Sequence, residues 1–217
     1  VMSEPLYGVY GASGCGRGIM PLAREQLAAK GVAAEHLVFV DDGDIDGQVN
    51  GHRVLTYEAF RDEAIHGGFL AIAIGDGVVR ERLAATCRSD GFSFWSVVAS
   101  NVVIMDDVKI GEGALLSPFV TITSNIRIGR FFHANLYSYV EHDCRIGDFV
   151  TFAPGVKCNG NIIIEDHAYI GAGATLRQGS PETPLEIGKG AIVGMGAVVT
   201  RNVPPGATVI GNPARPL

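Results

Sequence analysis

The chain has 217 residues, 47% of them hydrophobic, which is enough for one large domain or two small ones with a substantial core. Its 17 Lys and Arg residues are outnumbered by 23 Asp and Glu residues, the net charge is -6, and basic residues do not cluster. A nucleic-acid partner is therefore not expected, because phosphate binding needs clustered cations. No signal peptide or apolar stretch of about 20 residues is recognisable, so we expect a cytoplasmic protein that does not enter a membrane.

The four cysteines show no paired spacing that would indicate disulfides or a metal site. We interpret them as free thiols of a reducing compartment, and expect Cys144 and Cys158 to point inward. The histidines other than His142 share no metal-ligand spacing, so no metal is assigned.

The first 97 residues alternate between short apolar runs and helical patterns, which predicts a small parallel α/β sheet. One helical pattern follows the first apolar run and its glycine turn and ends near Gly31. A second helical pattern occupies residues 78–87. In such a sheet the binding crevice lies at the carboxyl ends of the strands. The expected strands are residues 6–10, 36–40, 69–74 and 94–98.

Three turns follow these runs and should share one edge of the sheet. The first is Gly11-x-x-Gly14-x-Gly16, which is not the G-x-G-x-x-G order of a dinucleotide fold; it is either a structural turn or a set of bare N–H groups facing a phosphate. The second is Asp41-Asp42, either a solvated turn or a pair of acceptors for a nucleobase or ribose. The third contains Gly75.

From Val98 to Leu176 every sixth residue is apolar, a pattern expected by chance on the order of 10⁻⁵ in a chain of this composition. Neither a helical nor a simple strand period explains it, whereas a short strand and a turn repeated every six residues do. Such repeats stack into a parallel β-helix in which three six-residue sides close one coil. We therefore predict a second domain over residues 98–217.

His142 and Asp143 stand near a corner of the predicted coil, away from the inward positions. They could be exposed polar side chains without a function. Alternatively, the imidazole could take a proton near neutral pH, because its ordinary pKa is about 6.5, while the carboxylate orients the ring.

Units such as Ile110-Gly-Glu-Gly-Ala-Leu and Val193-Gly-Met-Gly-Ala-Val resemble the hexapeptide repeat of left-handed β-helix acyltransferases. From Tyr10-Gly-Ala-Ser-Gly to Ile210-Gly-Asn-Pro-Ala-Arg, the chain is similar to bacterial acetyltransferases of nucleotide-linked amino sugars. This family includes a sialic-acid O-acetyltransferase-like group, bacillosamine-pathway N-acetyltransferases and GDP-perosamine N-acetyltransferases. The resemblance implies that the first domain holds the nucleotide sugar and that a trimeric left-handed β-helix binds acetyl-CoA between subunits.

The same resemblance implies roles for individual residues. Val140-Glu-His-Asp-Cys144 matches the family's catalytic segment, with His142 as general base and Asp143, where some relatives carry Glu, as its orienting acid. The expected nucleotide-sugar contacts are Ser13, Gly14, Cys15, Asp41, Asp42 and Gly75, with Asn135 facing the reacting centre. The expected acetyl-CoA contacts are Thr151, Gly160, Ala172 and Met195.

Two departures favour one branch of the family. Cys15 stands where some relatives carry His, and Thr151 stands where the bacillosamine enzymes carry a second His. Both favour the GDP-perosamine branch, whose products enter O-antigen (lipopolysaccharide) biosynthesis, over the UDP-sugar branch.

The repeat lapses once, between Leu176 and Ile187, where residues 177–186 include Pro181 and Pro184. This segment is either a tolerated surface loop or a loop leaning over the cofactor channel.

The family resemblance, together with the His142–Asp143 pair, implies an N-acetyltransferase that uses acetyl-CoA to acetylate the 4-amino group of a nucleotide-linked 4-amino-4,6-dideoxysugar. GDP-perosamine is the first candidate, and no metal is expected. His142 would remove the proton as the amine attacks the thioester, and the N–H of Gly160 would stabilise the oxyanion. The protein would be a homotrimer with active sites between subunits. We expect one side of the β-helix to be lined by Phe131, His133, Tyr137 and Tyr139, which is too aromatic for a free surface. The alternatives are a UDP-sugar N-acetyltransferase, a sialic-acid-type O-acetyltransferase and a non-catalytic sugar-nucleotide scaffold.

Overall fold

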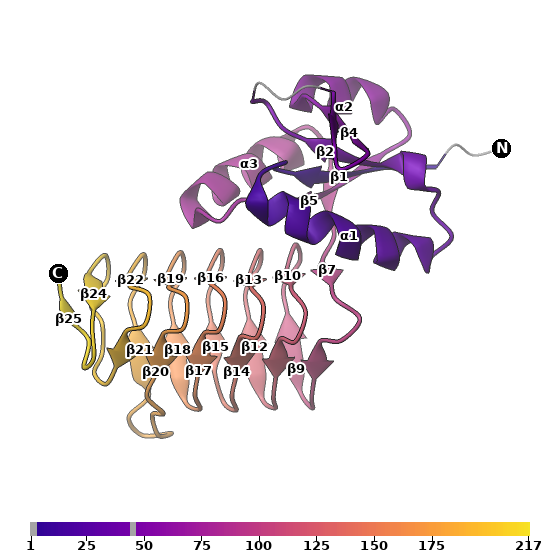
Figure 1. The fold of residues 1–217 in the computed structure, drawn as a ribbon. Coiled ribbons are helices and arrows are strands. Elements are labelled where there is room, and N and C mark those ends of the chain that lie inside the picture. Colours follow the sequence, from indigo (N-terminus) through magenta and orange to yellow (C-terminus); the bar gives the residue numbers. More distant parts are fainter. Residues whose placement is uncertain (1–3, 44–46) are drawn as a thin grey trace. The chain divides into compact units, whose positions relative to one another are not determined.

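The computed structural model describes residues 4–43 and 47–217, which form two compact units, Val1–Ser100 and Asn101–Leu217. The first unit is an α/β domain and the second is a left-handed parallel β-helix (Figure 1). The predicted fold class is therefore confirmed. Among the described residues, no helix has the length and apolar character needed to cross a bilayer.

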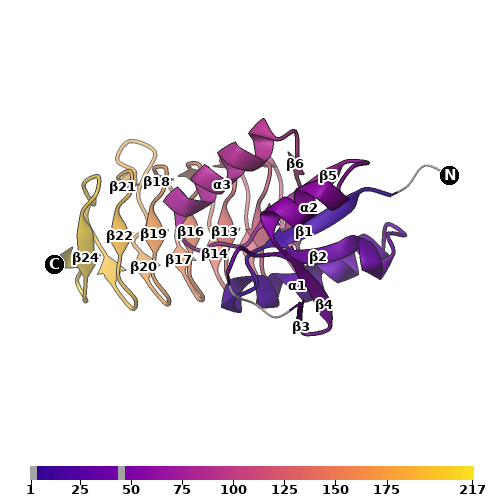
Figure 2. The same cartoon turned by 90° about the horizontal axis from the view of Figure 1, so that it is seen from above.

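The first unit is built on a six-stranded sheet of order β3-β4-β2-β1-β5-β6, with β1 in the middle between β2 and β5 (Figure 2). All neighbours pair in parallel except β3 and β4. The central strands are fully apolar because both faces of the sheet are covered. The strands are β1 (Leu6–Tyr10), β2 (Leu37–Val40), β3 (Gln48–Val49), β4 (His52–Leu55), β5 (Gly68–Ile72) and β6 (Ser93–Phe94).

Three α-helices connect these strands, and their first turns differ in one respect. Helix α2 (Tyr57–Glu63) is capped by the Thr56 hydroxyl, and α3 (Gly77–Ser89) by the Asp76 carboxylate. Helix α1 (Gly14–Ala28) follows Ser13, whose side chain makes no capping hydrogen bond. The first N–H groups of α1 therefore remain available to a ligand. A short 3₁₀ helix, η1 (Ala34–His36), precedes β2.

The sequence did not indicate β3, β4 or α2, because residues 48–63 are largely polar and half-exposed. The strand expected over residues 94–98 is two short strands, β6 and β7 (Val97–Val98), of which only β6 belongs to the N-terminal sheet.

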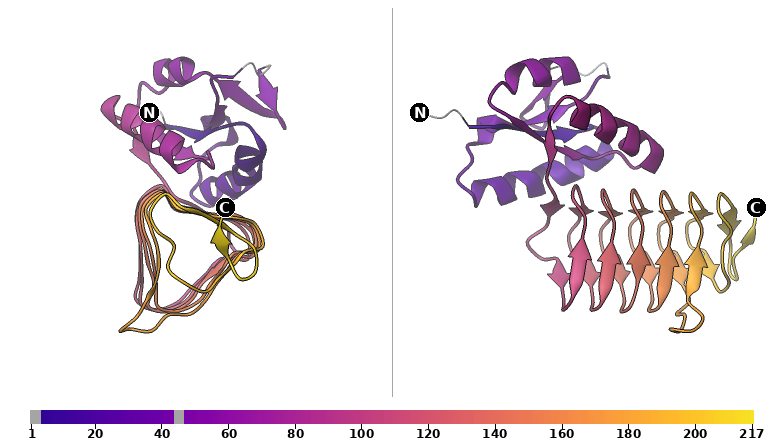
Figure 3. Two further views of the ribbon diagram at one scale, coloured as in Figure 1. Left: turned by 90° about the vertical axis from the view of Figure 1, so that its left-hand side faces the viewer. Right: turned by 180° about the vertical axis from the view of Figure 1, so that it is seen from behind.

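The β-helix has a triangular cross-section, seen end-on in the left view of Figure 3. One side carries β10 (Leu115–Leu116), β13 (His133–Ala134), β16 (Thr151–Phe152), β19 (Tyr169–Ile170), β22 (Ile192–Val193), β24 (Thr208–Ile210) and the antiparallel β25 (Arg215–Pro216). The second carries β8 (Val103–Ile104), β11 (Thr121–Ile122), β14 (Tyr139–Val140), β17 (Lys157–Cys158), β20 (Thr175–Leu176) and β23 (Val198–Val199). The third carries β9 (Val108–Ile110), β12 (Ile126–Ile128), β15 (Arg145–Ile146), β18 (Ile162–Ile164) and β21 (Leu185–Ile187).

The six-residue frame places one apolar side chain of each strand inside the coil. Leu116, Ala134, Phe152 and Ile170 pair in register from coil to coil, and all are buried. The first coil differs: Ile104 is exposed, because a terminal repeat has a neighbouring coil on only one side within this unit.

The corners of the coils recur with the same period, because a residue with positive φ turns the chain every six residues. Several of these residues are aromatic, and their rings stack from coil to coil: Phe131 on Phe149 at 5.0 Å and Phe149 on His167 at 5.4 Å. Stacking offsets the cost of left-handed backbone at residues other than Gly. The corner residues of positive φ are Asp107, Gly113, Phe119, Asn125, Phe131, Tyr137, Asp143, Phe149, Gly155, Asn161, His167, Gly173, Gly190, Gly196 and Gly206.

One expectation about the surface is wrong. The sequence places Phe131, His133, Tyr137 and Tyr139 on one exposed aromatic side, yet Phe131 and His133 are buried. Tyr137 alone of the four is largely exposed, and its ring stacks on that of exposed Phe119 at 4.9 Å.

Candidate active site

His142 and Asp143 form a hydrogen-bonded pair at the corner between β14 and β15. Asp143 has φ of 58°, which turns its side chain back toward the preceding ring. The Nδ1 atom of His142 lies 2.8 Å from Oδ2 of Asp143, and the two side chains are 43% and 49% exposed. Because an ionised carboxylate only accepts, Nδ1 is the donor of this hydrogen bond, and in a neutral ring Nε2 is the nitrogen that can accept a proton. The shorter Asp side chain therefore reaches the ring.

The other edge of the ring lies against Gly160 on the next coil. A Cβ at residue 160 would stand 2.6 Å from both Cε1 and Nε2 of His142. The coils are joined here by the Asn161 N–H, which donates to the His142 carbonyl at 3.0 Å. Within the described part of the chain, the Gly160 N–H donates no hydrogen bond. The structure thus packs the Nε2 edge of the His142 ring against Gly160, whose backbone N–H is free to donate to a ligand.

The remaining β-helix residues predicted for the site lie on other coils and corners. Asn135 follows β13 and donates from Nδ2 to the Phe152 carbonyl at 3.2 Å. Ala172 and Met195 stand on the same corner of successive coils, since the Gly196 N–H donates to the Ala172 carbonyl at 2.8 Å, and both are exposed. Thr151 is buried in β16.

A hollow of about 290 Å³ opens beside Asp143. Two guanidinium groups and two carboxylates line it, so their formal charges cancel. Arg127 is committed to both carboxylate oxygens of Asp107, at 2.9 Å each, and this hydrogen bonding lowers the pKa of Asp107. The hollow is lined by Asp107, Asn125, Arg127, Asp143, Cys144 and Arg145.

The two cysteines near the pair are buried, as predicted. The Cys144 and Cys158 thiols converge on the carbonyl of Asn159, at 3.3 and 3.9 Å. The hydrogen bond with Cys144, together with burial, raises the pKa of Cys158 well above its ordinary value. Because both thiols are buried inside the coil, neither is suited to carry an acyl group.

In the N-terminal unit, the three predicted turns do meet at one edge of the sheet. Tyr10, the last residue of β1, pairs with Val40 of β2 and with Ile72 of β5. The turns after these strands therefore lie side by side. Ser13, Gly14 and Gly75 are exposed and Cys15 is half-buried; burial raises the pKa of its thiol.

Two glycines of the first turn have a steric reason to be glycine. Gly11 has φ of 106°, which strains any other residue. Gly16 packs so closely on Gly11 that a Cβ would overlap the Gly11 carbonyl oxygen. Gly14 has open space around it, so its missing side chain leaves the start of α1 accessible.

The two carboxylates after β2 are already engaged by the domain itself. Asp41 accepts from the backbone N–H groups of Ala12 at 2.7 Å and Gly43 at 2.9 Å. Asp42 accepts from the Tyr10 hydroxyl at 2.6 Å and the Tyr57 N–H at 2.8 Å. Both tie neighbouring turns together, a role that the sequence did not indicate.

Arg80 is a further residue that the sequence analysis missed. It is fully buried, and its Nη1 donates to the carbonyls of Ile74 at 2.6 Å and Gly75 at 3.2 Å. Burial lowers the pKa of its guanidinium to about 10. The side chain thus holds the turn after β5. Its signal was available: Arg80, Ala84 and Cys87 form the buried stripe of α3 at helical spacing.

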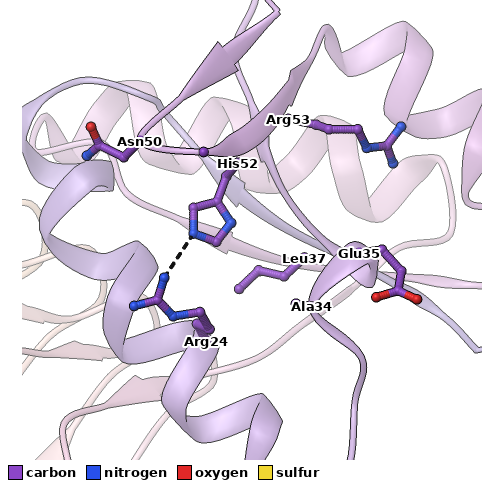
Figure 4. A pocket seen from close by; sticks show the side chains of 8 residues that line it. Arg24, Ala34, Glu35, Leu37, Asn50, His52 and Arg53 are labelled. Carbon is purple, nitrogen blue, oxygen red and sulfur yellow. Dashed lines mark hydrogen bonds between the residues drawn. The ribbon is translucent and has the colours of Figure 1, made fainter.

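A separate pocket of about 380 Å³ lies at the amino ends of β2 and β4 (Figure 4). Arg24 and His52 face one another across it, 3.5 Å apart. Burial, followed by the charge of Arg24, lowers the pKa of His52. No predicted site residue lines this pocket, because those residues lie at the opposite ends of the strands. Over the described residues, no cluster of three or more His, Cys, Asp or Glu side chains could hold a metal ion.

Comparison with known proteins supports the predicted family, although no profile of a described protein family matches the chain. Over 210 residues it is 49% identical to GDP-perosamine N-acetyltransferase of Escherichia coli O157:H7, covering 97% of this chain and 95% of that one. WeeI from Acinetobacter baumannii AYE is 57% identical, with a TM-score of 0.95 over 98% of this chain and 99% of that chain. PerB from Caulobacter crescentus, solved with CoA and GDP-perosamine, is 27% identical, with a TM-score of 0.86 over 100% and 99% of the two chains. The chain belongs to the left-handed β-helix, hexapeptide-repeat family of bacterial nucleotide-sugar N-acetyltransferases, which includes GDP-perosamine N-acetyltransferase.

Proposed function

We propose that the chain transfers an acetyl group from acetyl-CoA to the 4-amino group of a nucleotide-linked 4-amino-4,6-dideoxysugar, with GDP-perosamine as the first candidate. The single observation that carries the proposal is the His142–Asp143 pair, with the Nε2 edge of the ring packed against Gly160, whose backbone N–H donates no hydrogen bond within the described residues. The pair occurs in a chain 49% identical to a GDP-perosamine N-acetyltransferase.

The chemistry follows from the two ring nitrogens. As the amine nitrogen attacks the thioester carbon, Nε2 of His142 takes the proton that the amine loses. Asp143 holds the Nδ1 proton and stabilises the imidazolium that forms. The Gly160 N–H donates to the oxyanion. When the carbon–sulfur bond breaks, the imidazolium returns its proton to the departing CoA thiolate, so no acyl-enzyme is needed.

For the nucleotide sugar we propose the edge formed by the turns after β1, β2 and β5. The first turn of α1 lacks a side-chain cap, so its N–H groups suit a phosphate, and Ser13, Gly14 and Cys15 border it. Asp41 and Asp42 each keep lone pairs beyond those used within the domain, so they can still accept from a base or a ribose.

For acetyl-CoA we propose the exposed corner that carries Ala172 and Met195, with Met195 82% exposed. Thr151 and Asn135 are assigned to the cofactor and to the reacting centre by family resemblance alone. A cytoplasmic location and a role in O-antigen biosynthesis remain predictions.

The proposed assembly is a homotrimer with active sites shared between subunits. Its support is an apolar surface on the early coils, where Phe119 and Tyr137 are 53% and 64% exposed and stacked. Exposed Ile104 and Met105 belong to the same unit. Water-exposed apolar side chains of this size favour an interface. Sedimentation equilibrium at micromolar concentration should give three times the mass of the chain; a monomer contradicts the assembly.

The function is tested with purified protein, acetyl-CoA and three acceptors: GDP-perosamine, a UDP-linked 4-amino-4,6-dideoxysugar, and a GDP-linked 6-deoxysugar that carries a 4-hydroxyl. Thiol release and the mass of the product report transfer. We expect the GDP-linked amine to have the highest kcat/KM. If the UDP-linked sugar or the hydroxyl acceptor had the highest kcat/KM, that acceptor would replace GDP-perosamine as the proposed substrate. If no acceptor were acetylated, the proposal that the chain is an acetyltransferase would be refuted.

A further inference from the structure

The backbone that carries Gly160 is a support for the His142 ring. The backbone conformation at position 160 does not require glycine, since the φ of Gly160 lies outside the left-handed region. It needs glycine for space, because a Cβ would collide with the Nε2 edge of the ring. The position of the Gly160 peptide therefore decides where Nε2 stands.

Asn159 holds this peptide from one side through three hydrogen bonds. Its Oδ1 accepts from the Tyr139 hydroxyl at 2.9 Å, and its Nδ2 donates to the Leu176 carbonyl at 2.7 Å. Its own carbonyl accepts from the Cys144 thiol at 3.3 Å. The side chain thus joins the coil of His142, through Tyr139, to the coil that follows Gly160.

The insertion, residues 177–186, holds the adjoining backbone on the C-terminal side of Gly160. The Gly179 N–H donates to the Gly160 carbonyl at 2.9 Å, and the Leu185 N–H donates to the Asn161 carbonyl at 3.2 Å. Between these two points the loop is closed by paired hydrogen bonds of Ser180 with Thr183, at 3.0 and 3.1 Å. Its tip projects from one corner of the triangle (Figure 3).

Gly179 stands at the same corner of the β-helix as Asp143 and Asn161, which precede it on the two earlier coils. Both of those residues have positive φ, whereas Gly179 does not, because the chain leaves the coil there. A Cβ on Gly179 would overlap the Asn161 carbonyl oxygen, so this contact tolerates no side chain. The insertion is therefore packed directly on the support of His142.

We propose that Asn159 and Gly179 are positioning residues, which fix the Gly160 peptide so that the Nε2 atom of His142 meets the acceptor amine. This inference rests on the proposed function, because it takes His142 as the base. Displacing a catalytic group by about 1 Å can lower a rate by about 100-fold, so a small shift of the peptide is sufficient to matter.

The first test is Tyr139→Phe, which removes one hydrogen bond from Asn159 and no apolar contact. We expect kcat to fall about 10-fold, with both KM values and the melting temperature close to wild type. The control is Tyr7→Phe, which removes a hydroxyl from the N-terminal sheet. An unchanged kcat in Tyr139→Phe would overturn the role of Asn159.

The second test is Gly179→Ala against Gly188→Ala. Gly188 is equally crowded by backbone, since a Cβ there would meet Pro205, but it does not touch Gly160. We expect Gly179→Ala to lower kcat about 10- to 100-fold and Gly188→Ala to change only the melting temperature. Equal losses of kcat in the two variants would show that Gly179 acts through stability alone, against the proposal.

A spectroscopic readout separates this inference from the proposed function. The ring proton and nitrogen resonances of His142, assigned by comparison with His142→Asn, should shift in Tyr139→Phe and Gly179→Ala and stay in place in the controls. If the resonances shift although His142→Asn remains fully active, His142 is not the base and the proposed function fails. The inference that Asn159 and Gly179 fix the position of the ring would still hold. If His142→Asn is inactive and the resonances do not shift, the positioning role fails alone.

Discussion

The Tyr10 hydroxyl donates a 2.6 Å hydrogen bond to Oδ2 of Asp42, so this carboxylate joins the end of β1 to the turn after β2. Burial, followed by this hydrogen bond, raises the pKa of Tyr10 well above its ordinary value. Asp42 thus stabilises the domain, so an experiment on ligand binding must separate the effect on binding from the effect on stability.

Asp42→Asn and Tyr10→Phe separate the two roles. If Asp42 also accepts from the nucleotide, Asp42→Asn should raise KM for the nucleotide sugar about 10-fold or more and leave KM for acetyl-CoA unchanged, because one charge-assisted bond contributes about 1.5–3 kcal/mol. Tyr10→Phe should lower the melting temperature with a smaller change in that KM. Equal KM values in the two variants would leave Asp42 a purely structural residue.

His142→Asn should lower kcat by about 10²- to 10⁴-fold, because the amide keeps hydrogen-bonding capacity but cannot accept the proton. KM for acetyl-CoA should change little, since the ring is assigned to the proton. Steady-state kinetics at neutral pH provide the measurement, and near-normal turnover would exclude His142 as the base.

Gly160→Ala should lower kcat strongly, because its Cβ would take the place of the ring edge 2.6 Å away. A double-mutant cycle with His142→Asn identifies the cause. If ring displacement is responsible, the double variant should be no slower than His142→Asn alone. A further loss in the double variant would assign Gly160 an effect independent of the ring, such as the proposed oxyanion contact.

Arg80→Met should destabilise the protein by about 1–3 kcal/mol, because the carbonyls of Ile74 and Gly75 lose a buried donor. Urea unfolding measures this change. The turn that contains Gly75 should loosen, so KM for the nucleotide sugar should rise while KM for acetyl-CoA does not. A stable variant with unchanged KM would show that the guanidinium is dispensable for the turn.

Stability should decline in alkali, in part because burial raises the pKa of the Cys87 thiol from 9.0 to about 11. The folded state then keeps its proton longer than the unfolded chain does, so this contribution is complete below pH 9 and is lost as pH rises through 11. The raised pKa values of Tyr10 and Tyr57 act in the same direction. Cys87→Ala should flatten the dependence of unfolding free energy on pH between 9 and 11; an unchanged slope would contradict this assignment.

The sequence determined the β-helix almost completely, since its information is local and repeated. An apolar residue every six positions selects Leu116, Ile122 and Ile128 for the core, and each coil meets only its neighbours. The His142–Asp143 pair is also local, because adjacent residues at a corner need only one left-handed φ to meet. The turns after β1, β2 and β5 were predictable because parallel strands bring their carboxyl ends to one edge.

Only the tertiary structure decided what each of these groups touches. The contact of His142 with Gly160 joins residues one coil apart, and the bond of Gly179 to Gly160 depends on where an aperiodic insertion leaves the coil. Asp42 is engaged by Tyr10, 32 residues away, and Arg80 is buried against the strand end that precedes its own helix. A repeat specifies which side chains point inward. A hydrogen bond, however, needs its donor and acceptor at a narrowly defined distance, and that distance depends on how segments far apart in the sequence pack. For that reason the residues that could do chemistry were visible in the sequence, and those that hold them in place were not.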